Sequence, residues 1–300
     1  MIEYKNDEST RIDELHRKNK EAILGILKDS GIPFNTVKYE FFIDKTGSSM
    51  FDNQRIMEWT EKSSSKDYVL DITSLSKPLI YLFVSEVLKL RRKIGILHTS
   101  AAEYLPTSSK IEKTLGLLKK NVPQFFSEAD KLVEGELEPQ SKVTVRQNRN
   151  PGAAVYLVCF MSLKYKRVKK LLEELPVEAV DIIYPLSSDG IKSPRSKFAT
   201  KIANILVDDS GKAWPTGSDD HIGAYKKLRS LYSSHYLDSG INFEVGLTGT
   251  KMHTVAAGML GSIINFSGVY YTPVAFEPTK YTAGTGNSTF TELKMVTKKL

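Results

Sequence analysis

The sequence predicts an α/β protein with two Rossmann-like lobes, mostly parallel sheets and a C-terminal β-hairpin. Short apolar runs that suit strands alternate with longer segments that suit helices. This alternation is typical of a parallel sheet covered by helices on both faces. Because the pattern occurs twice, we predict a first Rossmann-like half at 1–106, a connecting insertion at 107–152 and a second half at 153–300.

Each element of the first half follows from a local pattern. Apolar residues at helical spacing predict helices, compact apolar runs predict strands, and clusters of Gly, Pro and Ser predict the turns between them. These rules give helices at 10–28, 50–62 and 79–90, and strands at 37–43, 68–72 and 94–99. The insertion contributes a helix at 110–120 and is otherwise polar.

The second half repeats the alternation. The rules give strands at 154–160, 180–184, 241–246 and 269–273, and helices at 164–175, 222–232 and 255–264. Residues 198–207 fit either a helix or a helix-to-strand transition, and 208–220 is predicted to be a polar loop. The tail is predicted to form a hairpin of 279–282 against 290–295, which turns on the glycine-containing stretch 283–287.

Composition narrows the functional classes. The net charge of +7 favours a polyanionic partner or ligand. No apolar stretch is long enough to cross a bilayer, and the polar N-terminal residues do not resemble a signal peptide. The single cysteine, Cys159, excludes an internal disulfide framework and a cysteine-rich zinc site. We therefore expect a cytoplasmic protein without membrane contact, metal or cofactor, in which Cys159 is a buried hydrophobic residue.

Two hydroxyl-rich turns carry the groups that an anionic ligand needs. The turns at 73–77 (TSLSK) and 248–251 (TGTK) each lie between a predicted strand and a predicted buried helix. Helix N-termini, hydroxyls and an ammonium together suit a phosphate, and open α/β sheets bind ligands beyond the carboxyl ends of their strands. Helix capping is an alternative role for Thr250, and for the serines of the first turn. The predicted ligand-binding residues are Thr73, Ser74, Ser76, Lys77, Ser187, Ser188, Thr248, Gly249, Thr250, Lys251 and His253.

The sequence contains no recognisable catalytic motif. The nucleotide-hydrolysing P-loop spacing is absent, and so are the G-x-S-x-G and H-E-x-x-H patterns. His98, at a predicted strand end, and His253 are the only candidates for a general base, and they are weak ones. The basic stretch 164–170 is either a solvated helix face or a nucleic-acid contact.

Residues 247–252 (LTGTKM) follow an apolar strand and precede an Ala-rich helix. They resemble the T-G-G-T-K-x-M signature of CRISPR-associated Rossmann-fold (CARF) domains and of the related SAVED domains. The following strand at 268–271 and the 281–285 turn also fit that pattern, so the motif resemblance covers residues 241–290. The turn departs from the signature, because one glycine stands where the family has two. The first half matches in layout alone, with 71–77 as the counterpart turn.

The resemblance implies a sensor of cyclic or linear oligonucleotide second messengers in antiviral defence. It also implies pairing of two chains around the ligand, as in CARF proteins, whereas SAVED proteins build a comparable site from two fused halves. No nuclease, protease or membrane effector is recognisable, so a stand-alone sensor, a ligand-degrading member and the sensing part of a system with a separate effector chain all stay open. Two other functions stay open at this point. One is a phosphodiesterase-like nuclease, similar to a ring nuclease, that degrades such a messenger. The other is a nucleic-acid-binding protein that uses the basic 164–170 helix.

Overall fold

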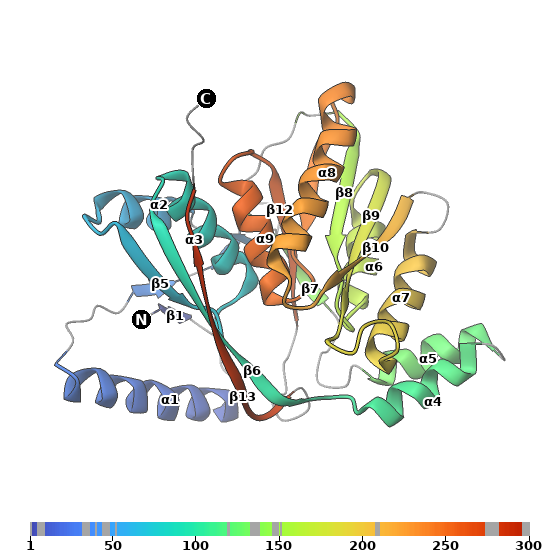
Figure 1. Cartoon of the computed structure of the whole chain (residues 1–300), viewed down its shortest axis with the longest axis horizontal. Helices are drawn as coiled ribbons and strands as arrows, with labels where there is room; N and C mark the ends of the chain where they lie inside the picture. Colours follow the sequence, from blue (N-terminus) through green and yellow to red (C-terminus); the bar gives the residue numbers. More distant parts are fainter. Residues whose placement is uncertain are drawn as a thin grey trace. The chain divides into compact units, whose positions relative to one another are not determined.

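The computed structural model describes two compact units, Met1–Asp52 and Asn53–Leu300 (Figure 1). It describes the chain except residues 1, 5–9, 32–36, 40, 44–48, 52, 119–120, 133–138, 146–149, 151, 208–210, 274–281 and 296–300. The first unit contains the long helix α1 (Thr10–Asp29). Two short strand pairs accompany it: β1 (Ile2–Tyr4) lies parallel to β2 (Val37–Tyr39), and β3 (Phe41–Ile43) lies antiparallel to β4 (Ser49–Phe51).

The main sheet of the second unit confirms the predicted α/β class. Its strands run in the order β10-β9-β8-β11-β12-β7. All neighbours are parallel except β7, which is antiparallel to β12. The bounds are β7 (Pro139–Val145), β8 (Val155–Phe160), β9 (Val177–Leu186), β10 (Gly211–Gly217), β11 (Asn242–Gly246) and β12 (Ser267–Pro273).

A crossover helix joins each parallel strand to the next. These helices are α6 (Lys166–Glu174), α7 (Pro194–Val207), α8 (His221–Ser239) and α9 (Lys251–Gly261). The chain moves outward from β8 to β10 and then returns to the other side of β8 with β11. This reversal between β8 and β11 is the topological switch point of a Rossmann-like sheet, beside which ligands of such folds bind.

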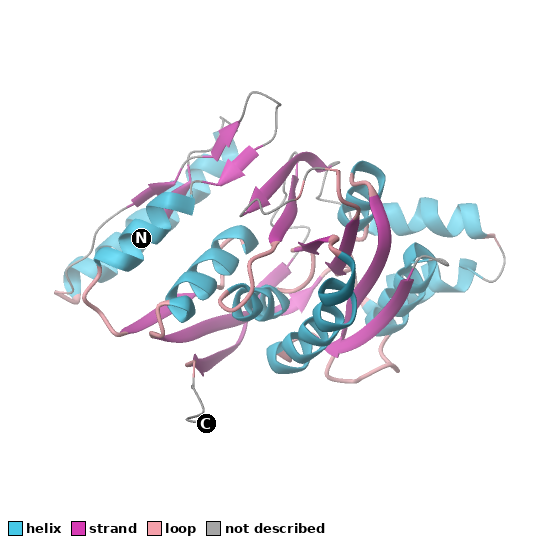
Figure 2. Ribbon diagram, turned by 90° about the horizontal axis from the view of Figure 1, so that it is seen from above, coloured by secondary structure: helices cyan, strands magenta, loops and turns pink. Residues whose placement is uncertain are grey.

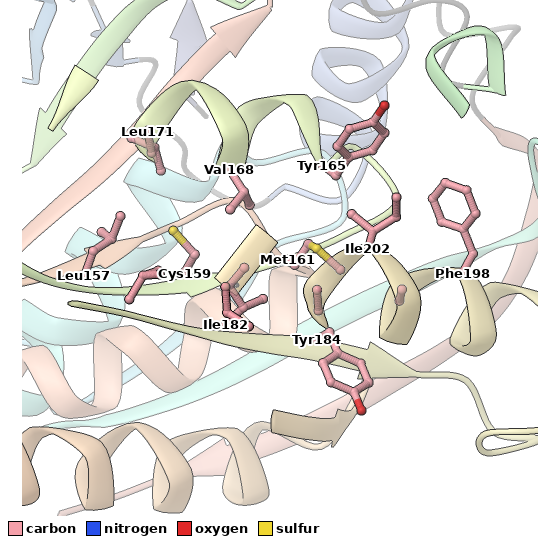
Figure 3. Packing of buried hydrophobic residues seen from close by; sticks show 14 of the residues in the cluster. Leu157, Cys159, Met161, Tyr165, Val168, Leu171, Ile182, Tyr184, Phe198 and Ile202 are labelled. Atoms are coloured by element: carbon pink, nitrogen blue, oxygen red, sulfur yellow. The ribbon is translucent and has the colours of Figure 1, made fainter. Parts of the chain in front are cut away.

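Helices cover both faces of the main sheet (Figure 2). On one face, α6 and α7 pack on the sheet, and α4 (Ser108–Leu118) and α5 (Val122–Leu132) extend that core. On the other face, Tyr156 contacts His235 of α8 with ring centroids 4.2 Å apart, and Phe160 stacks on His253 of α9 at 5.1 Å. Figure 3 shows the first core, which includes Leu157, Cys159, Val168, Leu171, Ile182, Phe198 and Ile202. As predicted, Cys159 is buried there, and burial raises the pKa of its thiol.

A second, three-stranded sheet of order β13-β6-β5 completes the unit. β5 (Asp67–Asp71) and β6 (Lys93–Tyr104) are parallel and joined by α3 (Lys77–Lys89), and β13 (Thr282–Leu293) lies antiparallel to β6. Side chains from this sheet, α3 and α9 share one core. The helix α3 is apolar nearly all round because it is covered on several sides.

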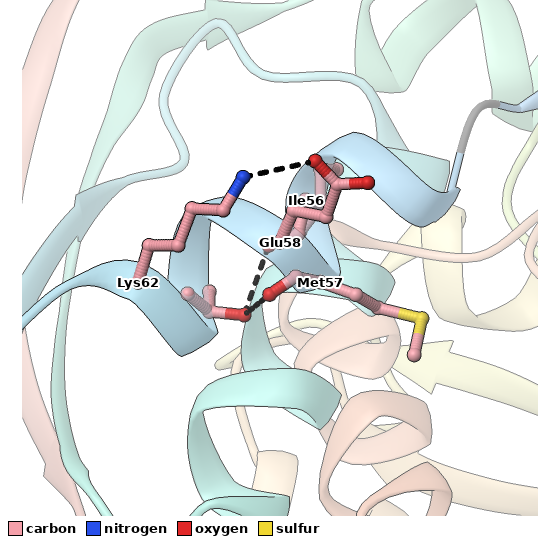
Figure 4. A network of polar contacts seen from close by, with 5 residues as sticks. Ile56, Met57, Glu58 and Lys62 are labelled. Atoms are coloured by element: carbon pink, nitrogen blue, oxygen red, sulfur yellow. Dashed lines mark hydrogen bonds and ion pairs between the residues drawn. The ribbon is translucent and has the colours of Figure 1, made fainter.

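The short helix α2 (Asn53–Lys62) precedes this sheet (Figure 4). The buried Thr60 hydroxyl donates to the carbonyls of Ile56 and Met57, at 2.9 and 2.8 Å, and is therefore satisfied within the helix. The exposed side carries an ion pair between Lys62 and Glu58 at 3.4 Å.

The predicted C-terminal hairpin is wrong within the described residues. Thr282–Leu293 is one continuous strand that pairs with β6, and residues 279–281 lie outside the described part. The glycine-containing stretch that was predicted to turn lies inside the strand. There, Gly284 has a positive φ of 65° and the register shifts between Thr285 and Ser288. The glycines therefore serve a bulge in a long edge strand rather than a hairpin turn.

The predicted loop at 208–220 is also wrong. Residues 211–217 (GKAWPTG) form β10, although Gly, Pro and Lys usually mark loops. These residues can form a strand because β10 lies at an edge of the main sheet. At an edge, the missing N–H of Pro215 costs no ladder hydrogen bond. The segment 107–152 contains α4, α5 and the sheet strand β7, of which only α4 was predicted. The boundaries predicted at 106 and 152 separate two halves that were predicted to resemble each other, and this division stays a prediction.

The close approach of α3 and α9 predicts an unusual glycine dependence. A Cβ atom on Gly258 would lie 2.7 Å from Cβ of Val84 and 3.1 Å from the Tyr81 carbonyl oxygen. We expect Gly258→Ala to lower the free energy of unfolding by about 1–3 kcal/mol through overpacking. Gly116→Ala is the matched control, because nothing lies within 4 Å of its added Cβ on α4, and it should stabilise by about 0.5–1 kcal/mol. Urea unfolding of both variants checks this, and equal effects would contradict it.

Candidate functional site

The loops that follow the parallel strands of the main sheet meet at its carboxyl edge. Three hydrogen bonds join them across the switch point. Thr248 Oγ1 donates to the carbonyl of Phe160 at the end of β8. Thr250 Oγ1 donates to Ser218 O at 2.8 Å, and Ser218 N donates to Leu186 O at 2.8 Å. The loops after β8, β9, β10 and β11 therefore form one connected edge.

The two threonines of the TGTK turn hold the loop itself. Thr248 is fully buried, and Thr250 is the N-cap of α9, where its Oγ1 also accepts from His253 N at 3.1 Å. Capping was the alternative role considered for Thr250, and it is confirmed. Gly249 lies against the end of β8, because a Cβ there would approach Phe160 Cβ to 2.6 Å. Both hydroxyls thus fix the backbone, and the loop presents backbone groups and Lys251 at the helix N-terminus.

His253 lies in the protein interior behind this loop. Its exposed fraction is 0%, and Nε2 lies 3.0 Å from Thr216 Oγ1 and 3.2 Å from Gly217 O. Burial and the nearby charge of Lys77 lower the pKa of His253 to about 4, although the Gly217 carbonyl opposes that shift. The imidazole is therefore neutral at physiological pH. It joins the end of β10 to the start of α9, which makes it a support for the loop.

Lys251 connects the two predicted turns. Its Nζ donates to the carbonyl of Thr73, which lies 178 positions away in the sequence and follows β5. Burial lowers the pKa of Lys251 to about 8, and the carboxylate of Asp71 opposes this shift. Within the described residues, Lys251 forms no ion pair within 4.0 Å. The turn at 73–77 and the TGTK turn therefore lie side by side, and a cation stands between them.

The 73–77 turn has its own internal order. Thr73 N donates to Asp71 Oδ1 at 2.8 Å, and Thr73 Oγ1 accepts from Thr99 N at 3.0 Å. Ser74 is exposed. Ser76 is the N-cap position of α3, but its side chain makes no capping hydrogen bond. Lys77 begins α3, and its ammonium lies 5.6 Å from the centre of the Tyr270 ring.

His98 lies on β6, close enough to Lys251 to feel its charge. Burial and the charge of Lys251 lower its pKa, and Asp219 and Asp71 oppose that shift. The imidazole is only partly covered, unlike that of His253. It is thus the one of the two predicted histidines that is within reach of solvent and near Lys251.

Arg167 and Tyr270 belong to this edge, although the sequence analysis did not select them. Arg167 Nη1 donates to Tyr270 Oη at 2.7 Å, and the guanidinium lies 5.1 Å from the centre of the ring. Tyr270 therefore has cations on Arg167 and Lys77 close to its ring. Arg167 was grouped with the basic 164–170 stretch, yet only 5% of it is exposed. Its place in the first turn of α6, the helix that follows the switch-point strand β8, was the signal that could have singled it out.

Ser187 and Ser188 follow β9 at the same edge but are turned to other partners. Ser187 Oγ donates to Ser193 Oγ at 2.6 Å and lies 3.2 Å from Ser196 Oγ, at the start of α7. Ser188 is exposed in a turn. In the described part of the chain, neither serine hydrogen-bonds to Lys251, so the structure brings together 73–77 and 248–253 more closely than 187–188.

We define the carboxyl-edge site by Lys77, His98, Arg167 and Lys251 around Thr73 and Tyr270. Lys251 at the start of α9 bonds to Thr73, whereas Lys77 at the start of α3 and Arg167 lie over the Tyr270 ring. The 73–77 turn belongs to both groups, and cations at helix N-termini attract anions. Among the residues that the structure describes, no three His, Cys, Asp or Glu side chains gather in a way that could hold a metal ion. Nor is any described helix long and apolar enough to cross a membrane.

Comparison with known proteins assigns the chain to no family. No model of a protein family matches the chain, and no curated protein matches it. The likeness to CARF and SAVED domains therefore rests on the 247–252 motif and its surroundings alone.

Proposed function

We propose that the chain is a sensor that binds a cyclic or linear oligonucleotide second messenger, of the cyclic oligoadenylate type, in prokaryotic antiviral defence. The ligand binds at the carboxyl-edge site. The observation that carries this proposal is the hydrogen bond from Lys251 Nζ to the Thr73 carbonyl. It joins the two turns that were predicted from the sequence to bind a phosphate, and the resemblance to CARF and SAVED domains is the separate ground for the oligonucleotide class.

The chemistry of the site supports a phosphate-bearing ligand with bases. Lys251 and Lys77 provide charge for phosphates, and charge-assisted hydrogen bonds of this kind are the strong ones. The ring of Tyr270, which Arg167 holds in place, offers a surface on which a base can stack. We further propose that two copies of the chain pair around the ligand and that a separate effector chain receives the signal, in the cytoplasm.

Removal of the Lys251 ammonium tests the proposal. We expect Lys251→Ala to weaken binding of cyclic oligoadenylates by roughly 10- to 100-fold, because one charge-assisted hydrogen bond contributes about 1.5–3 kcal/mol. Lys201→Ala, on the exposed side of α7, is the matched control and should bind as the unaltered chain does. Isothermal calorimetry provides the affinities, and circular dichroism verifies the fold. Equal affinity in both variants would rule out this role for Lys251.

The lowered pKa of Lys251 gives the binding a defined pH dependence. The ammonium is charged below its pKa of about 8 and loses its proton above it. Affinity for the anionic ligand should therefore be constant near pH 7 and fall as the pH rises through about 8. A Lys251→Arg variant should not show this fall, because a guanidinium stays protonated. Calorimetry between about pH 7 and pH 9.5 measures both curves. Parallel curves would show that another group controls the titration.

A nuclease that degrades the messenger is the second candidate, and the position of His98 favours it. A neutral, partly exposed imidazole beside Lys251 is suited to act as a general base, while the ammonium stabilises the charge that develops on phosphorus. Incubation with cyclic oligoadenylates followed by chromatography separates the two functions. A sensor returns the ligand intact. Cleavage that is lost in His98→Ala, but kept in the neighbouring Thr99→Ala, would establish the nuclease instead.

Nucleic-acid binding by the 164–170 stretch is less well supported. Lys164 and Arg167 are buried, and the exposed lysines of α6 each lie near a carboxylate. These ion pairs are Lys166–Asp130 at 3.7 Å, Lys169–Glu173 at 3.9 Å and Lys170–Glu174 at 3.4 Å. A paired face of this kind presents little net charge to a phosphate backbone.

A further inference from the structure

A hollow of about 490 Å³ lies between α8 and the strands β8, β9 and β10. We call it the α8 hollow. Its lining includes Tyr156, Asp181 and Lys212, which lie in the first halves of their strands. The carboxyl-edge site instead follows the last residues of those strands. The α8 hollow is therefore a separate feature, at the amino end of the sheet, and its volume lies in the range of small-molecule pockets.

Small side chains on both walls leave this space open. Ala179 of β9 lies opposite Tyr156 in register, and the C-terminal half of α8 contributes Ser230 and Ser234, one turn apart. Protein interiors are otherwise packed to nearly crystalline density. Elsewhere along α8, Ala224 and Leu228 are buried. The hollow thus arises where the small side chains of Ala179, Ser230 and Ser234 meet.

A buried carboxylate organises the aromatic floor of the hollow. Asp181 is only 5% exposed, and it accepts from Tyr156 Oη, from Lys212 N at 2.8 Å and from Trp214 Nε1 at 3.1 Å. Burial and this hydrogen bond raise the pKa of the Tyr156 hydroxyl, which keeps it a donor. With three donors, Asp181 is satisfied by the protein itself. Its effect is to fix the orientation of the phenol and indole rings, a form of preorganisation.

The remaining charges of the lining are positive. The ammonium of Lys227 lies 3.7 Å from the centre of the Trp214 ring. Lys212 is on the same face of β10 as Trp214, two residues earlier, and it is exposed. A cationic ligand would meet these two lysines without an available carboxylate among the described lining residues. A ligand with an acidic group would instead pair with Lys227, whose ammonium lies over the Trp214 ring.

We propose that the α8 hollow binds a small aromatic acid, that is, a planar ring that carries a phosphate or carboxylate, of about the size of a nucleoside monophosphate. The ring packs against Trp214 and His235, and the acidic group pairs with Lys227. Tyr156, which is 1% exposed, supports His235 from within the protein. This site does not depend on the proposed function. It is separate from the carboxyl-edge site, and a loss of one leaves the other intact.

Tryptophan fluorescence reads this site directly. The chain has two tryptophans, so a Trp59→Phe background leaves Trp214 as the single reporter. We titrate it with AMP and 4-hydroxybenzoate, which represent the phosphate and carboxylate forms of the ligand, and with adenosine and inorganic phosphate, which each lack one part. At least one of the two aromatic acids should give a saturable change with a Kd between about 1 μM and 1 mM. Adenosine and phosphate should bind at least about tenfold more weakly.

Neighbouring residues on α8 supply matched controls. Lys227→Met and Ser234→Phe should each weaken binding at least about tenfold, by loss of the ion pair and by filling the hollow. Lys226→Met and Ser233→Phe, which lie outside the lining, should leave it unchanged. Lys251→Ala should also leave it unchanged, which separates this site from the carboxyl-edge site. The proposal is overturned if neither aromatic acid binds up to about 10 mM, if both lining variants bind normally, or if adenosine or phosphate alone binds as well.

Discussion

The close packing of α3 against α9 is the constraint on which the carboxyl-edge site depends. Gly258 and Gly261 leave no room for a side chain between α9 and Tyr81 and Val84 of α3. Both helices begin with a lysine, Lys77 and Lys251, and the tight helix contact brings the turns before them together. Without that approach, the three-stranded sheet and the main sheet would present two separate lysine turns instead of one electropositive edge.

Within that edge, the threonines of the TGTK turn have a structural role, and Lys251 carries the charge. The hydroxyls of Thr248 and Thr250 are bonded to Phe160 and Ser218, and the buried imidazole of His253 ties the helix start to the end of β10. The loop is therefore held from three sides before any ligand arrives, which reduces the ordering cost of binding. In the proposed function, Lys251 is the group that meets the ligand. Its partial burial lowers its pKa, and a charge in such a place interacts more strongly with an anion than one in open water.

The strand β10 and the helix α8 link the two proposed sites. Thr216 and Gly217 contact His253 at one end of β10, whereas Lys212 and Trp214 line the α8 hollow at the other. Asp181 fixes Trp214 in the same way that Ser218 and Phe160 fix the threonines, through hydrogen bonds from one strand or loop to the next. In both sites, hydrogen bonds to adjacent strands or loops thus hold the side chains in place. Both sites also contain residues of β10, the edge strand that was predicted to be a loop.

The sequence by itself determined the α/β class, most helix and strand positions of the second half, and the two lysine turns, because apolar periodicity and turn residues are local signals. Only the tertiary structure decided that β10 and β13 are strands, since edge positions tolerate the Pro and Gly that otherwise indicate loops. It also decided that Lys251 reaches Thr73 and that Arg167 and Tyr270 join them, because contacts between residues far apart in the sequence depend on how helices and sheets pack. The α8 hollow had no local signal at all. Its walls come from three strands and a helix that meet only in the folded chain.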